Sequence, residues 1–146
     1  MFFVNGIPVA TAELKTDLSV QNVHDAVLQY KHHRLPKGEP LLQFGSRAVV
    51  HFVVSNSEVQ MTTKLAGKDT VFLPFNRGDR GHAGNPANPH GSATAYLWQQ
   101  IFDRDTWLDI LGRFLHLQID EKIDLLLTRR SAVSGCCSLA TTNGMW

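Results

Sequence analysis

The chain has 146 residues, of which 43% are hydrophobic and 18% charged, and its net charge is +1 at pH 7. This length and composition indicate one globular domain with a core of its own. The near-neutral charge neither favours nor excludes a nucleic-acid partner. No apolar run approaches the roughly 20 residues that span a bilayer. The apolar residues 1–4 lack a preceding basic region, so we expect no signal peptide, no membrane association and a cytoplasmic location.

The first predicted element is a β-hairpin over residues 2–15. An apolar run at residues 2–4 precedes Asn5-Gly6, the strongest short signal for a hairpin turn. The return strand is expected to follow over residues 7–15, where side chains alternate between the two faces of the sheet.

A helix is predicted after the hairpin, from Val20 to Lys31. Its apolar residues recur at three- and four-residue steps. Ser19 is the expected N-cap, and the helix should end before Leu35-Pro36.

Two further strands are predicted at residues 48–54 and 59–63, joined by a turn at residues 55–57. The first is a nearly continuous apolar run, which is typical of a central strand. Residues 71–73 form a possible short strand, and residues 74–94 are a long loop rich in Gly, Asn and Pro. Loops of this length in a compact domain are usually functional or mobile.

Two helices are predicted after the long loop. One spans residues 95–102, and the other is capped by Asp105. The second helix has an apolar face made of Trp107, Leu108, Leu111, Phe114 and Leu115. The resulting order of strands and helices indicates a mixed α/β domain.

Glu13-Leu14-Lys15 is the segment that points to chemistry. Residues two apart on a strand project to the same face, so Glu13 and Lys15 should lie together while Leu14 points into the core. A carboxylate can hold Mg²⁺ through oxygen, and the metal can polarise a phosphate. A lysine beside it can orient water or neutralise charge that develops on the phosphate.

An exposed Glu–Lys pair is common on strands, so the motif alone is a weak signal for a nuclease site. Its position in the chain strengthens that signal. The pair ends a hairpin strand that leads directly into a helix, as in the β-β-α module of PD-(D/E)xK nucleases. The helix ends in the basic run Lys31-His32-His33-Arg34. This run could contact a phosphate backbone, or it could be a solvated helix end that the helix dipole favours.

Several long phrases resemble a known family. The chain is similar, over residues 2–123, to the N-terminal nuclease region of the restriction (R) subunit of type I restriction-modification enzymes. The phrases that carry the resemblance are FVNGIPVATAELKT, HDAVLQYKHHRLP, RAVVHFVVS, MTTKLAGKDTVFLPFNRG, GNPANPHG and TAYLWQQIFDRDTWLDILGRFLHL.

The resemblance implies an incomplete restriction-endonuclease-like domain, an α/β mixed sheet with flanking helices. It implies Glu13 as the metal-binding acid, Lys15 as the catalytic lysine and Mg²⁺ as the cofactor. The complete enzyme binds and cleaves foreign unmodified DNA with methylation (M) and specificity (S) subunits, and it uses ATP in motor domains. Four residues are candidates for DNA contact: Gln29, Tyr30, Lys31 and Arg34.

The chain departs from the family pattern in three ways. The family site needs an aspartate upstream of the hairpin turn, and residues 1–4 contain none. No phosphate-binding G-x-x-x-x-G-K-[ST] loop exists, so we expect no ATP site in this chain. The likeness stops after Asp124, and we expect residues 124–146 to be a frameshifted or unstructured tail.

Three hypotheses follow. The first is a partial nuclease domain, covering residues 1–123, that is inactive alone. The second is a compact Mg²⁺-dependent nuclease that recruits its missing acid from elsewhere in the chain. The third is a non-catalytic module that binds DNA or another subunit, with salt-sensitive DNA binding that ignores Mg²⁺.

Overall fold

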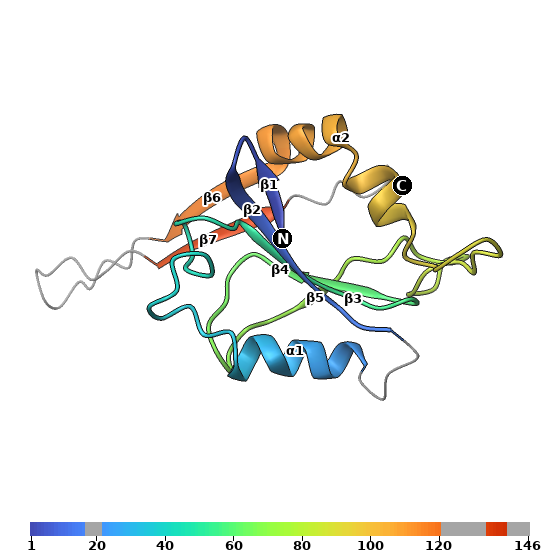
Figure 1. Cartoon of the computed structure of the whole chain (residues 1–146), viewed down its shortest axis with the longest axis horizontal. Coiled ribbons are helices and arrows are strands. Elements are labelled where there is room, and N and C mark those ends of the chain that lie inside the picture. The colour runs from blue at the N-terminus through green and yellow to red at the C-terminus, as the bar shows by residue number, and fades with distance from the viewer. Residues whose placement is uncertain (17–21, 121–133, 140–146) are drawn as a thin grey trace, which may run out of the picture.

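A five-stranded mixed sheet forms the centre of the computed structural model, which describes residues 1–16, 22–120 and 134–139 (Figure 1). Its strands, in spatial order, are β1 (Phe2–Val4), β2 (Ile7–Leu14), β3 (Val50–Val54), β4 (Val59–Thr62) and β5 (Leu73–Pro74). β2 and β3 run parallel, and the other neighbouring pairs are antiparallel. The predicted mixed α/β class is therefore confirmed.

The first hairpin forms where the sequence predicts it. Val4 pairs with Ile7, so Asn5 and Gly6 make a two-residue turn. Both have positive φ, 49° and 79°, as the primed turns that match strand twist require. β2 then crosses over through a helix to the parallel strand β3.

The crossover helix α1 (Val23–His32) begins later than the sequence analysis expected. Its N-cap is Asn22, whose side chain accepts a hydrogen bond from the Asp25 N–H at 3.1 Å. The Asp25 carboxylate in turn accepts the Asn22 N–H at 2.7 Å. This reciprocal capping box fixes the helix start, whereas Ser19, the predicted cap, lies outside the described residues.

Helical segments cover both faces of the sheet (Figure 1). α1 lies on one face. The other face is covered by the π-helical segment η1 (Leu97–Ile101), α2 (Arg104–Asp109) and the π-helical segment η2 (Ile110–Phe114). Asp103, not the predicted Asp105, caps α2, because its side chain accepts the Asp105 N–H.

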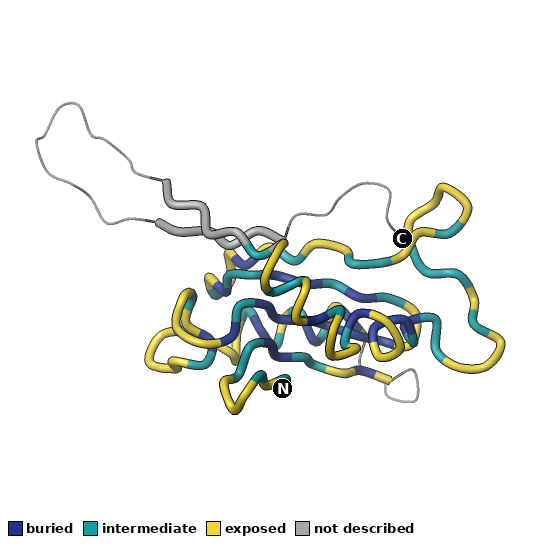
Figure 2. The backbone as a smooth tube through the Cα atoms, turned by 90° about the horizontal axis from the view of Figure 1, so that it is seen from above, coloured by how far each residue is buried: buried dark blue, intermediate teal, exposed yellow. Residues whose placement is uncertain are grey.

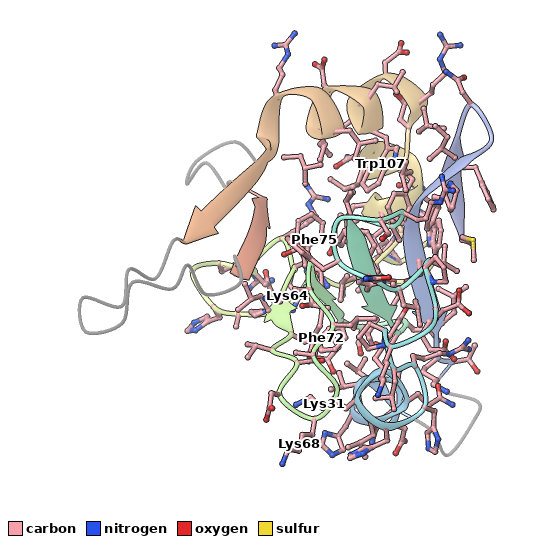
Figure 3. All side chains as sticks on the ribbon, turned by 90° about the vertical axis from the view of Figure 1, so that its left-hand side faces the viewer. Lys31, Lys64, Lys68, Phe72, Phe75 and Trp107 are labelled. Carbon is pink, nitrogen blue, oxygen red and sulfur yellow. The ribbon has the colours of Figure 1, made fainter. Side chains whose placement is uncertain are left out.

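Two hydrophobic clusters hold these layers together, and Figure 2 shows buried backbone concentrated in the central strands. The larger cluster includes Phe52, Leu97 and Trp107, which lie between the sheet and η1–α2. The smaller one joins α1 to the sheet through Tyr30 and Val53. Figure 3 shows Trp107 on the α2 side of the sheet. The β3 side chains alternate between the two clusters, which explains its continuous apolar sequence.

A second, two-stranded sheet pairs β6 (Leu115–Asp120) with β7 (Ser134–Leu139). The apolar pattern predicts Leu115 at the end of a helix instead, and residues 124–146 are expected to be an unstructured tail. The overlooked signal is the period-two alternation of Leu115, Leu117 and Ile119, which favours a strand.

In the described parts of the chain, no helix has both the length and the apolar character needed to cross a bilayer.

Candidate active site

Glu13 and Lys15 lie together on the face of the sheet that carries α1. The Lys15 Nζ is 4.0 Å from Glu13 Oε1, and the lysine side chain is only 7% exposed. The Lys15 N–H donates to the Val54 carbonyl at 2.8 Å, which continues the β2–β3 ladder past Leu14. The predicted common orientation of the two side chains is therefore confirmed.

Leu14 does not point into the core, as the sequence analysis expected, but is 57% exposed. Ala10 and Ala12 share its face of β2, and both pack into the cluster beneath η1 and α2. Leu14 is the last residue of the strand. Leu14 does not belong to that cluster. Its side chain points to the predicted face of the sheet, but η1 and α2 do not cover that face at the end of β2.

Arg34 completes a three-residue charged cluster around Glu13. It follows α1, and its Nη2 donates to Glu13 Oε2 at 3.5 Å. Lys15 is closest to the other carboxylate oxygen, Oε1. Two cations therefore balance a single acid, and the more exposed of them, Arg34, is the one free to reorient, since its side chain is 55% exposed.

A buried hydrogen-bond network lies next to this cluster. The Thr11 hydroxyl is 2.8 Å from the Tyr30 hydroxyl and 2.8 Å from His51 Nδ1. Burial raises the pKa of Tyr30 to about 12, and burial lowers the pKa of His51 to about 4. Both side chains are therefore neutral near pH 7, and the Thr11 hydroxyl links them through two hydrogen bonds.

A pocket of about 430 Å³ opens beside these residues. Its lining combines β2, the end of α1 and the crossover to β3, and Met1 also reaches it. The lining residues are Met1, Thr11, Ala12, Glu13, Tyr30, His33, Arg34, Leu35, Glu39, Leu41 and Leu42. Three predicted site residues, Glu13, Tyr30 and Arg34, thus face one cavity.

The other two candidates for DNA contact lie elsewhere on α1. Gln29 and Lys31 are half-buried and do not line the pocket. Gln29 Oε1 is buried and has no hydrogen-bond partner in the described part of the chain. Of the predicted basic run, Arg34 is the residue in contact with Glu13.

Sequence reasoning missed Thr11, His51 and Glu39. Thr11 could have been found, because it precedes Glu13 by two residues on the same strand and so shares its face. His51 is opposite Thr11 in the parallel register of β2 and β3, and that register has no local sequence signal. Glu39 is brought to the pocket by an irregular crossover, which sequence periodicity does not predict.

The pocket offers oxygen ligands but no dense metal cluster. Its two acidic lining residues are Glu13 and Glu39. No group of three His, Cys, Asp or Glu side chains suited to holding a metal ion occurs within the described residues. Mg²⁺ commonly uses one or two carboxylates and completes its shell with water and substrate phosphate. Glu13 and Glu39 are side chains of the type that holds such an ion.

Comparison with known proteins relates the first part of the chain to a family. Residues 1–70 match the family described as the type I restriction enzyme R protein N terminus. The match covers 70 of the 146 residues and agrees with the resemblance seen in the sequence. The matched segment contains β1 to β4, α1 and every residue of the charged cluster. No curated protein and no solved structure matches the chain.

Proposed function

We propose that this chain is the nuclease region of a type I R subunit and that Glu13 and Lys15 act on the DNA phosphodiester backbone. The carrying observation is the Glu13–Lys15 pair, on one face at the end of β2 and beside a polar pocket. The family match of residues 1–70 supports the R subunit. Binding and cleavage of foreign unmodified DNA are proposed for the complete enzyme, with this chain inactive alone.

The local topology supports a restriction-endonuclease-like arrangement. A hairpin, β1–β2, leads into α1 and then into the parallel strand β3. The acid and the lysine lie at the carboxyl end of the second hairpin strand, as the PD-(D/E)xK pattern requires. Met1, which immediately precedes β1, lines the same pocket as Glu13. The strand on which the resemblance expects an aspartate therefore reaches the site.

In this proposal Mg²⁺ is the cofactor, held by Glu13 and, through the shared pocket, by Glu39. When bound, it would supply positive charge to the phosphate and lower the pKa of a water molecule. Lys15, nearly buried beside Glu13, would donate hydrogen bonds to the attacking water or to the phosphate. Arg34 would leave Glu13 and pair with a phosphate oxygen, which a guanidinium binds well.

The proposed partners follow from the family. DNA is the substrate, and the M and S subunits supply methylation and sequence recognition in the complete enzyme. ATP belongs to motor domains, since the sequence contains no phosphate-binding loop.

Divalent-cation binding tests the proposal in the chain itself. Mn²⁺ binding, followed by electron paramagnetic resonance, should weaken strongly in Glu13→Gln because that substitution removes the charged ligand. DNA affinity should rise when Ca²⁺ is added to the wild-type chain, and Glu13→Gln should lose this rise. Lys15→Gln should keep Mn²⁺ affinity but bind DNA more weakly.

Asp69→Asn is a matched control, because Asp69 is exposed and does not line the pocket. It should leave both measurements unchanged. If Glu13→Gln and Asp69→Asn behave alike, Glu13 is not a metal ligand and the nuclease proposal is wrong.

A non-catalytic module for DNA or subunit binding is the second candidate. One observation favours it: Glu13 already has two cationic neighbours, at 4.0 and 3.5 Å. In that case DNA binding should be salt-sensitive, indifferent to divalent cations and intact in Glu13→Gln.

A further inference from the structure

The loop between β5 and η1 contains a short hairpin with Arg80 at its tip. Asp79 and His82 exchange backbone hydrogen bonds of 2.9 and 2.8 Å, and Gly78 N–H donates to Gly84 O at 2.9 Å. Arg80 and Gly81 are the two residues of the turn. We call residues 77–85 the Arg80 hairpin.

Two asparagine side chains fasten the base of the Arg80 hairpin to the sheet. Asn85 Oδ1 accepts the Arg77 N–H at 2.8 Å, and Asn85 Nδ2 donates to Ser57 O at 3.0 Å and to Asn76 Oδ1 at 2.9 Å. Asn76 Oδ1 also accepts the Val59 N–H at 2.8 Å. The loop that the sequence predicted as irregular is thus anchored on the turn between β3 and β4.

This anchor places the Arg80 hairpin at the end of the sheet where β2 and β3 finish, which is the end that carries Lys15. Lys15 is hydrogen-bonded to Val54, the last residue of β3, and Ser57 lies in the turn that follows. Figure 1 shows the loop extending beyond the end of the sheet where β2 finishes. A ligand that lies across this end of the sheet could contact both the Arg80 hairpin and Lys15.

The conformation of Arg80 is unfavourable for an arginine. The first hairpin has φ values of 49° and 79° at Asn5 and Gly6, and Arg80 and Gly81 have nearly the same values, 48° and 84°. Asn and Gly adopt positive φ readily, whereas a long side chain does so at a cost. Strained residues of this kind often mark functional positions.

Local contacts do not compensate for this cost. The Arg80 side chain is 91% exposed, and its Nε lies 3.6 Å from Oδ1 of the neighbouring Asp79. Such exposed pairs contribute little to stability. The position therefore offers an exposed guanidinium on a hydrogen-bonded hairpin, at the expense of the stability of the fold.

We propose that the Arg80 hairpin contacts the phosphate backbone of duplex DNA bound across the end of the sheet that carries Glu13 and Lys15. A guanidinium binds phosphate oxygens in a bidentate manner, and loops anchored on a folded scaffold commonly carry binding residues. The proposal rests on the proposed function only in taking DNA as the ligand.

The test is a single substitution, Arg80→Asn, which gives this turn the sequence of the first one. Removing the strain should raise the Tm of the full chain by about 3 °C. Losing one phosphate contact should also reduce the slope of log K against log salt by about 0.9, measured by fluorescence anisotropy with a short labelled duplex in EDTA. Arg80→Lys should keep most of the slope.

Arg104→Gln is the matched control. Arg104 is 88% exposed and pairs with the adjacent Asp105 at 3.6 Å, much as Arg80 does with Asp79, but it lies in α2. It should change neither measurement. Arg80→Asn with an unchanged salt slope, or with a lower Tm, overturns the proposal. Because this assay contains no divalent cation, that failure is separate from failure of Glu13 as a metal ligand.

Discussion

Arg34 Nη2 lies 3.5 Å from Glu13 Oε2, so an arginine holds an oxygen that the proposed divalent cation would use. Metal binding must therefore compete with this ion pair. Exposed ion pairs contribute about 0.2–1 kcal/mol, so Arg34→Gln should increase Mn²⁺ affinity by at most about fivefold. Isothermal titration or electron paramagnetic resonance would measure the change.

Lys31→Gln is the control for this prediction, because Lys31 belongs to the same basic run but does not line the pocket. It should leave Mn²⁺ affinity nearly unchanged. A weaker Mn²⁺ affinity in Arg34→Gln would show that the arginine supports the metal site instead of competing for it.

Thr11→Val should destabilise the fold although it conserves side-chain shape. Thr11 bonds to both Tyr30 and His51, and it is buried. Valine would leave two polar groups without this partner, at a cost of about 2–4 kcal/mol. Tyr30→Phe should cost less, roughly 1 kcal/mol, because Thr11 keeps its bond to His51. Urea denaturation of both variants would give the order, and equal losses would contradict it.

His51 should make stability fall in mild acid. Its pKa is lowered by burial from 6.5 to about 4, so the unfolded chain takes up a proton at a pH where the folded chain does not. Its contribution is fully present above pH 6.5 and is lost as pH falls toward about 4. The loss amounts to roughly 3 kcal/mol.

Denaturation of His51→Gln at several pH values would check this. The variant should be less stable at neutral pH, but its stability should depend less on pH between 6.5 and about 4. His24→Gln, at an exposed position on α1, should retain the wild-type pH dependence. An unchanged pH dependence in His51→Gln would exclude His51 as its source.

The reading frame of the tail can be tested directly on the gene. If residues from about 125 onward are out-of-frame translation, a shifted frame should continue downstream into a phosphate-binding loop with the pattern GK[ST]. Sequencing several hundred bases on each side would show it. An uninterrupted original frame with no such loop would contradict the frameshift, and β7 would then belong to a native domain.

Local signals explain what the sequence predicted well. Asn5-Gly6 predicts its turn because both residues tolerate positive φ. Glu13 and Lys15 share a face because the strand period is two. The Asn22–Asp25 capping box is also local, but the apolar period continues back to Val20 and therefore favours Ser19 as the cap.

What the sequence did not predict depends on contacts between distant segments. The parallel register of β2 and β3 brings His51 to Thr11. The length of the crossover decides that Glu39 reaches the pocket, and the position of η1 and α2 decides that Leu14 stays uncovered. None of these three features produces a periodic pattern in the sequence.

The site and its support come from different stretches of chain. Glu13, Lys15 and Arg34 all lie within one hairpin-helix unit, but Phe52, on the opposite face of the same sheet, is covered by Trp107 and Phe102. A polypeptide cut at residue 70 would carry every charged group of the site and expose to water the face of the sheet that η1 and α2 cover. The segment that carries the charged groups is therefore shorter than the segment that is needed to bury the core.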